Sequence, residues 1–148
     1  MKTKQFITTL GALLSVFLLA PTAFAAGAHC TLTAIEASND GKGTDAELKD
    51  IKELTEPPLS TTYSRFKFSG KAEGDLEVGV TKDLTPNKKQ VAKLTFQGEE
   101  ATSKKLQLKV ELPDLKFNAD LKLKSGANFM IATKSGFLLA VKCAFPSA

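Results

Sequence analysis

Hydrophobic and polar residues alternate with a period of two along most of the chain beyond residue 61. The clearest run is 106–112, where Leu, Leu, Val and Leu alternate with Gln, Lys and Glu. Such alternation is typical of strands in an antiparallel sheet that buries one face and exposes the other to water. Similar runs lie at 66–68, 76–80, 92–96, 115–123, 129–133 and 137–145.

Turn-forming residues separate these runs and set the number of predicted strands. They lie at Ser69-Gly70, 85–88, 98–100, Pro113-Asp114 and Ser125-Gly126. Short strands at this spacing are typical of sandwiches and barrels. We therefore predict an all-β fold, an antiparallel β-sandwich or a partly open barrel of about seven or eight strands.

The region before residue 61 has a different pattern. Residues 30–38 are rich in β-branched side chains and predict a first strand. Thr44 and Glu47 have the spacing of a capping box, in which each side chain binds a free backbone N–H at the start of a helix. Three apolar residues follow at intervals of three: Leu48, Ile51 and Leu54. We expect one short helix here, near the N-terminus, that ends at Pro57-Pro58.

Residues 1–25 have the features of a cleaved signal peptide. Two lysines precede an apolar run at 10–20, and Ala23-Phe24-Ala25 places small residues at the two positions that a signal peptidase reads. The apolar run is short for a membrane span. We predict that cleavage leaves one domain, residues 26–148, which is secreted or periplasmic and has no stable membrane span.

Charge and aromatic content argue against nucleic-acid binding. The chain has 20 Lys and Arg against 16 Asp and Glu, and two of the lysines lie in the predicted signal peptide. Arg65 is the only arginine, and tryptophan is absent. Because nucleic-acid recognition depends on arginine forks and stacked aromatic rings, we expect a protein or another cell-envelope component as the partner instead.

The two cysteines, Cys30 and Cys143, lie near opposite ends of the predicted mature domain. An even pair in an exported protein is usually disulfide-bonded. A redox pair would have closer spacing, as in Cys-x-x-Cys. We therefore predict a structural disulfide that joins the first strand to the last.

His29 is the only histidine, which limits the chemistry available to the chain. One histidine and two cysteines do not supply a multi-ligand zinc site, and no nucleophile, base and oxyanion pocket can be assembled from the sequence. We therefore predict no enzyme activity, no catalytic residues, no metal and no cofactor. One alternative stays open: a chain trimmed to begin at Gly27 would place His29 third, in a square-planar Cu(II) site.

The segment 56–63 is the best candidate for a binding site. Two prolines stiffen it, and Leu59 and Tyr63 could anchor a partner, or else both side chains cap the end of the sandwich. A free sheet edge is a second candidate, because a partner could add a strand there. We predict a non-enzymatic binding or assembly module of the cell envelope. The alternative is a carrier that holds a small apolar ligand or lipid in an internal cavity.

Several short motifs run through most of the predicted mature domain: Ile35-Glu36-Ala37-Ser38, Gly41, Gly43, Asp45, Leu48, Leu54, Pro57-Pro58-Leu59-Ser60, Tyr63, Leu112-Pro113 and Gly136-Phe137-Leu138-Leu139. Together they resemble a family of uncharacterised exported proteins from myxobacteria and their relatives. The resemblance implies export and a β-domain, and it implies no particular function.

Overall fold

The computed structural model describes residues 27–145, so the predicted signal peptide, residues 1–25, lies outside the described residues. Over this range, no helix is both long and apolar enough to cross a membrane. The described chain is mostly strand: β1 Ala28–Ser38, β2 Gly43–Thr44, β3 Arg65–Leu76, β4 Thr81–Asn87, β5 Gln90–Glu99, β6 Leu106–Leu112, β7 Phe117–Leu123, β8 Asn128–Ala132 and β9 Phe137–Ala144. The helical elements are short: η1 Ala46–Leu48, η2 Lys52–Thr55, α1 Leu59–Thr62 and η3 Pro113–Leu115.

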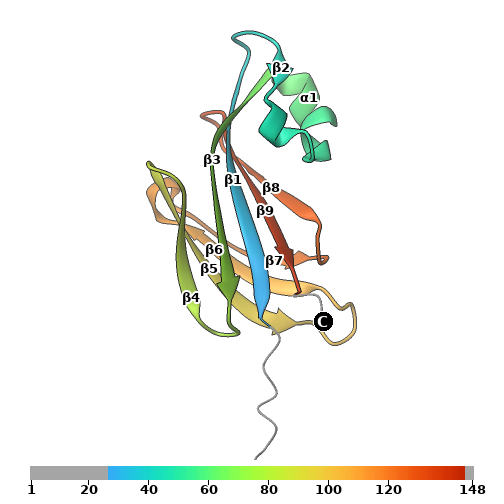
Figure 1. The fold of residues 1–148 in the computed structure, drawn as a ribbon, viewed down its shortest axis with the longest axis vertical. Helices are drawn as coiled ribbons and strands as arrows, with labels where there is room; N and C mark the ends of the chain where they lie inside the picture. The colour runs from blue at the N-terminus through green and yellow to red at the C-terminus, as the bar shows by residue number, and fades with distance from the viewer. Residues whose placement is uncertain (1–26, 146–148) are drawn as a thin grey trace, which may run out of the picture.

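The strands form two sheets that pack as two layers (Figure 1). The five-stranded sheet has the order β2-β3-β1-β9-β8, and the four-stranded sheet has the order β4-β5-β6-β7. Neighbouring strands are antiparallel, except that β2 is parallel to β3. The predicted all-β sandwich is therefore confirmed.

The main core fills the space between the two sheets. Strand β6 shows how the sequence builds it: Leu106, Leu108, Val110 and Leu112 are fully buried, and the polar residues between them are only partly buried. Strand β1 contributes Ala28, Cys30 and Leu32 to this core. Each buried leucine stabilises the fold by roughly 1.5–3 kcal/mol relative to an exposed one.

A second, smaller core lies on the outer face of the five-stranded sheet, under residues 45–63, which we call the cap (Figure 1). The sheet side of this core consists of Ile35, Ala37, Phe66, Leu138 and Ala140, and the cap side consists of Leu48, Ile51 and Leu54. The odd-numbered residues of β1 face this outer side. Ile35 and Ala37 lie under the cap, whereas His29, Thr31 and Thr33 lie beyond it.

A short α-helix, α1, does lie near the N-terminus, but it follows the segment that was predicted to be helical. The sequence pattern predicted that the helix ends at Pro57-Pro58, whereas Pro58 is the N-cap residue of α1. The segment expected to be helical forms η1 and η2 instead, and Asp45, not Thr44, precedes η1. Leu48 ends η1, Ile51 lies between η1 and η2, and Leu54 lies in η2, and all three are buried in the second core against the sheet.

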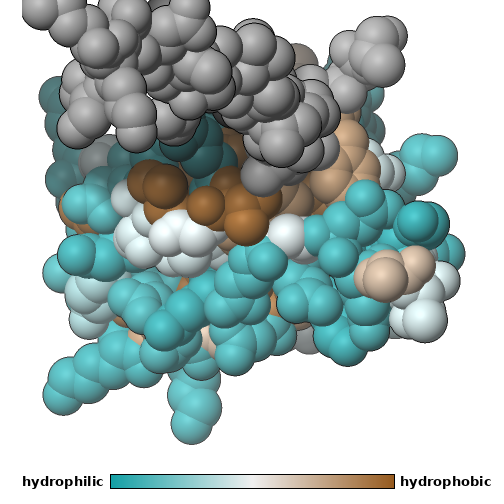
Figure 2. All heavy atoms as spheres, turned by 90° about the horizontal axis from the view of Figure 1, so that it is seen from below, coloured by the Kyte–Doolittle hydropathy of each residue, from teal (hydrophilic) through white to brown (hydrophobic). Residues whose placement is uncertain are grey.

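Two predicted strand boundaries were also wrong, one within β3 and one after it. Ser69-Gly70 is a bulge inside one long strand, where the register with β1 shifts, and not a turn between two strands. Of the strand expected at 76–80, Leu76 is the last residue of β3, and residues 77–80 form a loop in which Val78 makes an isolated bridge to Phe96. Val78 and Val80 are 38% and 51% exposed, and the view of this end of the molecule shows a small apolar area among hydrophilic residues (Figure 2).

Candidate functional site

The two binding residues predicted from the sequence, Leu59 and Tyr63, lie on and next to α1. Both side chains are partly buried and pack against the second core. The Tyr63 ring meets the Phe66 ring edge-on, with centroids 6.3 Å apart. Both residues thus contact the core on the outer face of the five-stranded sheet, and a binding role for them stays a prediction.

The predicted disulfide between Cys30 and Cys143 is present. The two residues face each other on β1 and β9, with Cα atoms 4.1 Å apart, and both side chains are buried in the main core. The bond links positions 113 residues apart and therefore closes almost the whole described chain into one loop. The bond also holds β1 and β9 together. The residue before each cysteine, His29 on β1 and Lys142 on β9, faces the opposite side of the sheet.

That opposite side contains a groove of about 640 Å³, which we call the outer groove. Its floor consists of small side chains from β1 and β9: Thr31, Thr33, Ala140 and Ala144. The cap closes one end with Glu47, Asp50 and Ile51, and Phe68 lies at the same end. The same two strands, β1 and β9, also contribute His29 and Lys142, and the flanking strands β3 and β8 contribute Lys71, Glu73 and Asn128. The cap end of the groove therefore combines the apolar Ile51 and Phe68 with two acidic side chains, and charged and polar groups line the remainder.

Charged groups of both signs line the outer groove. Two pairs involve its residues: Lys71 Nζ lies 2.7 Å from Glu73 Oε1, and His29 Nδ1 lies 2.8 Å from Asp75 Oδ1. The hydrogen bond and charge of Lys71 lower the pKa of the Glu73 carboxyl, so Glu73 is ionised at neutral pH.

Three further charged groups of the groove are not paired in this way. Lys142, Glu47 and Asp50 are exposed and make no ion pair within residues 27–145. Across the same residues, no group of three or more His, Cys, Asp and Glu side chains could hold a metal ion. The groove therefore presents one cation and two anions that are available to a bound molecule.

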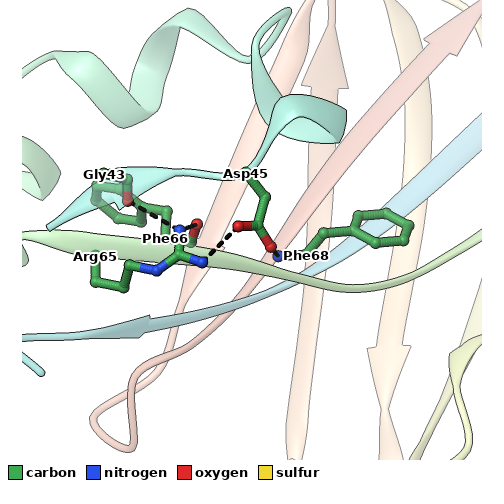
Figure 3. Close-up of polar contacts among 5 residues, drawn as sticks. All are labelled: Gly43, Asp45, Arg65, Phe66 and Phe68. Atoms are coloured by element: carbon green, nitrogen blue, oxygen red, sulfur yellow. Dashed lines mark hydrogen bonds and ion pairs between the residues drawn. The ribbon is translucent and has the colours of Figure 1, made fainter. Parts of the chain in front are cut away.

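The cap wall of the groove is held in place by Asp45 and Arg65 (Figure 3). Arg65 Nη2 donates a hydrogen bond of 2.5 Å to Asp45 Oδ1, and the Phe68 backbone N–H donates one of 2.9 Å to Asp45 Oδ2. Arg65 Nη1 also donates to the carbonyl oxygens of Gly43 and Phe66. These donors, with Arg65 first, lower the pKa of the Asp45 carboxyl. The contacts fix the start of η1 on β3 and so position the groove residues Glu47 and Asp50.

Comparison with known proteins found no matching family model, no similar curated protein and no similar solved structure. The resemblance to a family of exported proteins therefore stays a prediction.

Sequence reasoning missed the outer groove because its residues come from positions as far apart as 29 and 142. Neither the cap position nor the order of β3, β1, β9 and β8 follows from local patterns. One signal was present: the outward positions of β1 change from polar to apolar between Thr33 and Ile35. That change marks where the uncovered half of the sheet face ends and the capped half begins.

Proposed function

We propose that this protein is an exported, non-enzymatic binding or assembly module of the cell envelope, and that it binds a segment of a partner protein in the outer groove. The observation that carries the proposal is the groove itself. Half of one sheet face is left uncovered, with a floor of small side chains and unpaired charges of both signs along its walls. The leader-like residues 1–25 and the buried disulfide support an oxidising, exported location.

The chemistry of the groove favours a polar peptide segment over other occupants. Lys142 can pair with a carboxylate of the partner, while Glu47 and Asp50 can pair with a lysine or arginine. Asn128 can donate and accept hydrogen bonds with a main chain. Ile51 and Phe68 offer an apolar contact at the cap end, where one apolar side chain of the partner would be buried.

Photo-crosslinking in the producing cell tests this proposal. A photoreactive residue replaces Thr31 in the groove floor, or Asn118 on β7 of the other sheet as the matched control. We expect a protein adduct from position 31 and none from position 118. Charge reversal in the groove, Lys142→Glu or Asp50→Lys, should weaken the adduct at least about fivefold, because rim charges steer and orient partners. Lys109→Glu on β6 should leave it unchanged.

Three results would overturn the proposal. They are no adduct from position 31, equal adducts from both positions, and an adduct that is insensitive to both charge reversals. Mass spectrometry of an organic extract of the purified mature protein distinguishes the carrier alternative, because a carrier would retain an apolar ligand at about one molecule per chain. If such a ligand is found and no adduct forms at position 31, the carrier function is favoured.

A further inference from the structure

Strand β8 is a sheet edge that lacks the usual protection against pairing. Exposed edges are normally protected by charged residues, prolines or bulges, because their free N–H and C=O groups can pair with another strand. Strand β4 contains Lys82, Asp83, Pro86 and a register shift, and β7 contains Asp120 and Lys122. The five residues of β8, Asn-Phe-Met-Ile-Ala, include no charge and no proline, and their pairing with β9 has no register shift.

The register of β9 shows which backbone groups of β8 face outward. In an antiparallel pair of strands, opposite residues with closely spaced Cα atoms do not hydrogen-bond each other through the backbone. Cys30 on β1 and Cys143 on β9 are such a pair. The backbone N–H and C=O of Cys143 therefore point away from β1 and toward β8. Two bonds agree with this: Gly126 N–H donates to Cys143 O over 2.9 Å, and Thr133 N–H donates to Phe137 O over 3.0 Å. Odd-numbered residues of β9 therefore bond to β8.

The same alternation identifies the free groups of β8. Phe129 and Ile131 are opposite Val141 and Leu139, and they use their backbone groups to bond β9. The N–H and C=O groups of Asn128, Met130 and Ala132 consequently point away from the sheet. Because β8 is the last strand in the order of its sheet, no strand of residues 27–145 pairs with these groups.

We propose that a second copy of this chain pairs with β8 in antiparallel orientation, about a twofold axis that passes midway between the two Met130 residues. In this register Asn128 lies opposite Ala132 of the second copy, and the two Met130 residues face each other. All three positions carry outward N–H and C=O groups, so the register forms about six backbone hydrogen bonds. A strand is complementary to itself in this way only when its free groups are arranged symmetrically about its centre, as they are here.

Side chains support the same register. Phe129, which is 38% exposed, would lie opposite Ile131 of the second copy, an aromatic and β-branched pair of the kind that stabilises antiparallel strands. The strand contains no charge that would repel its copy. Lys124 and Lys134 flank β8 and limit the pairing to these five residues. Because the shared edge is short, we expect a reversible dimer.

The dimer would join the two five-stranded sheets into one sheet of ten strands. The twofold axis is then perpendicular to this sheet, so both outer grooves open on the same face. Asn128 belongs to both the groove and the paired edge. The pairing through β8 does not depend on the proposed function. A binding surface that combines the two outer grooves does depend on it.

Sedimentation velocity of the mature, disulfide-bonded protein over a wide concentration range tests the pairing. We expect a monomer–dimer equilibrium. Ala132→Pro removes an outward N–H at an exposed position and leaves the bonds to β9 intact, and it should weaken dimerisation at least about tenfold. Phe129→Lys should do the same through charge repulsion. The control Asn118→Lys places the same charge on β7 and should not change the equilibrium.

Amide hydrogen exchange of the unmodified protein provides a second readout that does not depend on any variant. Raising the protein concentration should slow exchange at Met130 and Ala132, and leave Phe129, already bonded to β9, unaffected. A protein that remains monomeric at millimolar concentration would overturn the pairing. A dimer that forms equally well with Ala132→Pro and Phe129→Lys would also overturn it, because a different surface must then be responsible.

Discussion

The two faces of the five-stranded sheet are built in different ways. The inner face is apolar over most of its length and packs against the four-stranded sheet. The outer face is apolar only beneath the cap, and the remainder forms the outer groove. Strand β1 shows both patterns. Its even-numbered residues, on the inner side, are apolar up to Ala34, whereas its outward residues change from polar to apolar after Thr33. The inner face is thus buried between the two sheets, and the outer face is divided between a buried part under the cap and an open groove.

If the inner face carries most of the stability, removal of the disulfide should have the largest effect. The double substitution Cys30→Ala and Cys143→Ala should lower the free energy of unfolding by about 2–5 kcal/mol, because the bond restrains a very long loop in the unfolded chain. Urea unfolding measures the change. As a control, unfolded but unreduced wild-type protein should not react with a thiol-alkylating reagent. Reaction at both cysteines, or an unchanged urea midpoint, would contradict the structural role of the disulfide.

The two cores can next be compared through matched leucines. Leu108 in the main core and Leu54 beneath the cap are 0% and 1% exposed. Leu108→Ala should lower the free energy of unfolding by about 2–5 kcal/mol, because it leaves a cavity between two sheets that cannot collapse. Leu54→Ala should cost less globally, since the cap can open while the sandwich stays folded.

Limited proteolysis separates these two outcomes. Leu54→Ala should speed cleavage within residues 45–63 under native conditions, whereas Leu108→Ala should affect cleavage only through global unfolding. Equal losses of stability, together with equal protection of the cap, would show that the cap and the sandwich unfold as one unit. In that case the outer face contributes to global stability as strongly as the inner face.

The main core between the two sheets was largely predictable from the sequence, because period-two alternation determines which residues of a strand are buried. This is why the pattern at 106–112 predicted β6 and its buried residues correctly. The disulfide followed from the number and placement of two cysteines. Neither prediction required knowledge of how distant parts of the chain are arranged.

The outer face was not predictable in the same way. An interval of three between Leu48, Ile51 and Leu54 is compatible with an α-helix and a 3₁₀ helix, and contact with the sheet decides between them. Gly70 suggested a turn, but it is needed because β3 passes very close to β4. A Cβ atom at Gly70 would lie 1.9 Å from the Pro86 carbonyl oxygen. Both features depend on tertiary contacts that no local pattern contains.

The smallest predicted effect concerns the attachment of the cap to β3. The pKa of Asp45 is lowered in the folded protein by Arg65 and by the Phe68 N–H. The Asp45 carboxylate therefore stabilises the folded state fully above its ordinary pKa of 3.8, and this contribution is lost as the pH falls from that value through the lowered pKa. Asp45→Asn should remove this part of the pH dependence and loosen the cap at neutral pH.

Proteolysis of residues 45–63 as a function of pH measures this effect. Wild type and Asp45→Asn should differ most at neutral pH and converge in acid, because a protonated Asp45 no longer accepts both hydrogen bonds as an anion. Glu100→Gln is the matched control: hydrogen bonds from Ser103 and Lys122 also lower the pKa of Glu100, but this residue lies away from the cap, after β5. Its substitution should change acid stability and leave cap cleavage as in wild type. If both variants loosen the cap alike, its attachment does not depend on Asp45, and the outer groove has a different source of rigidity.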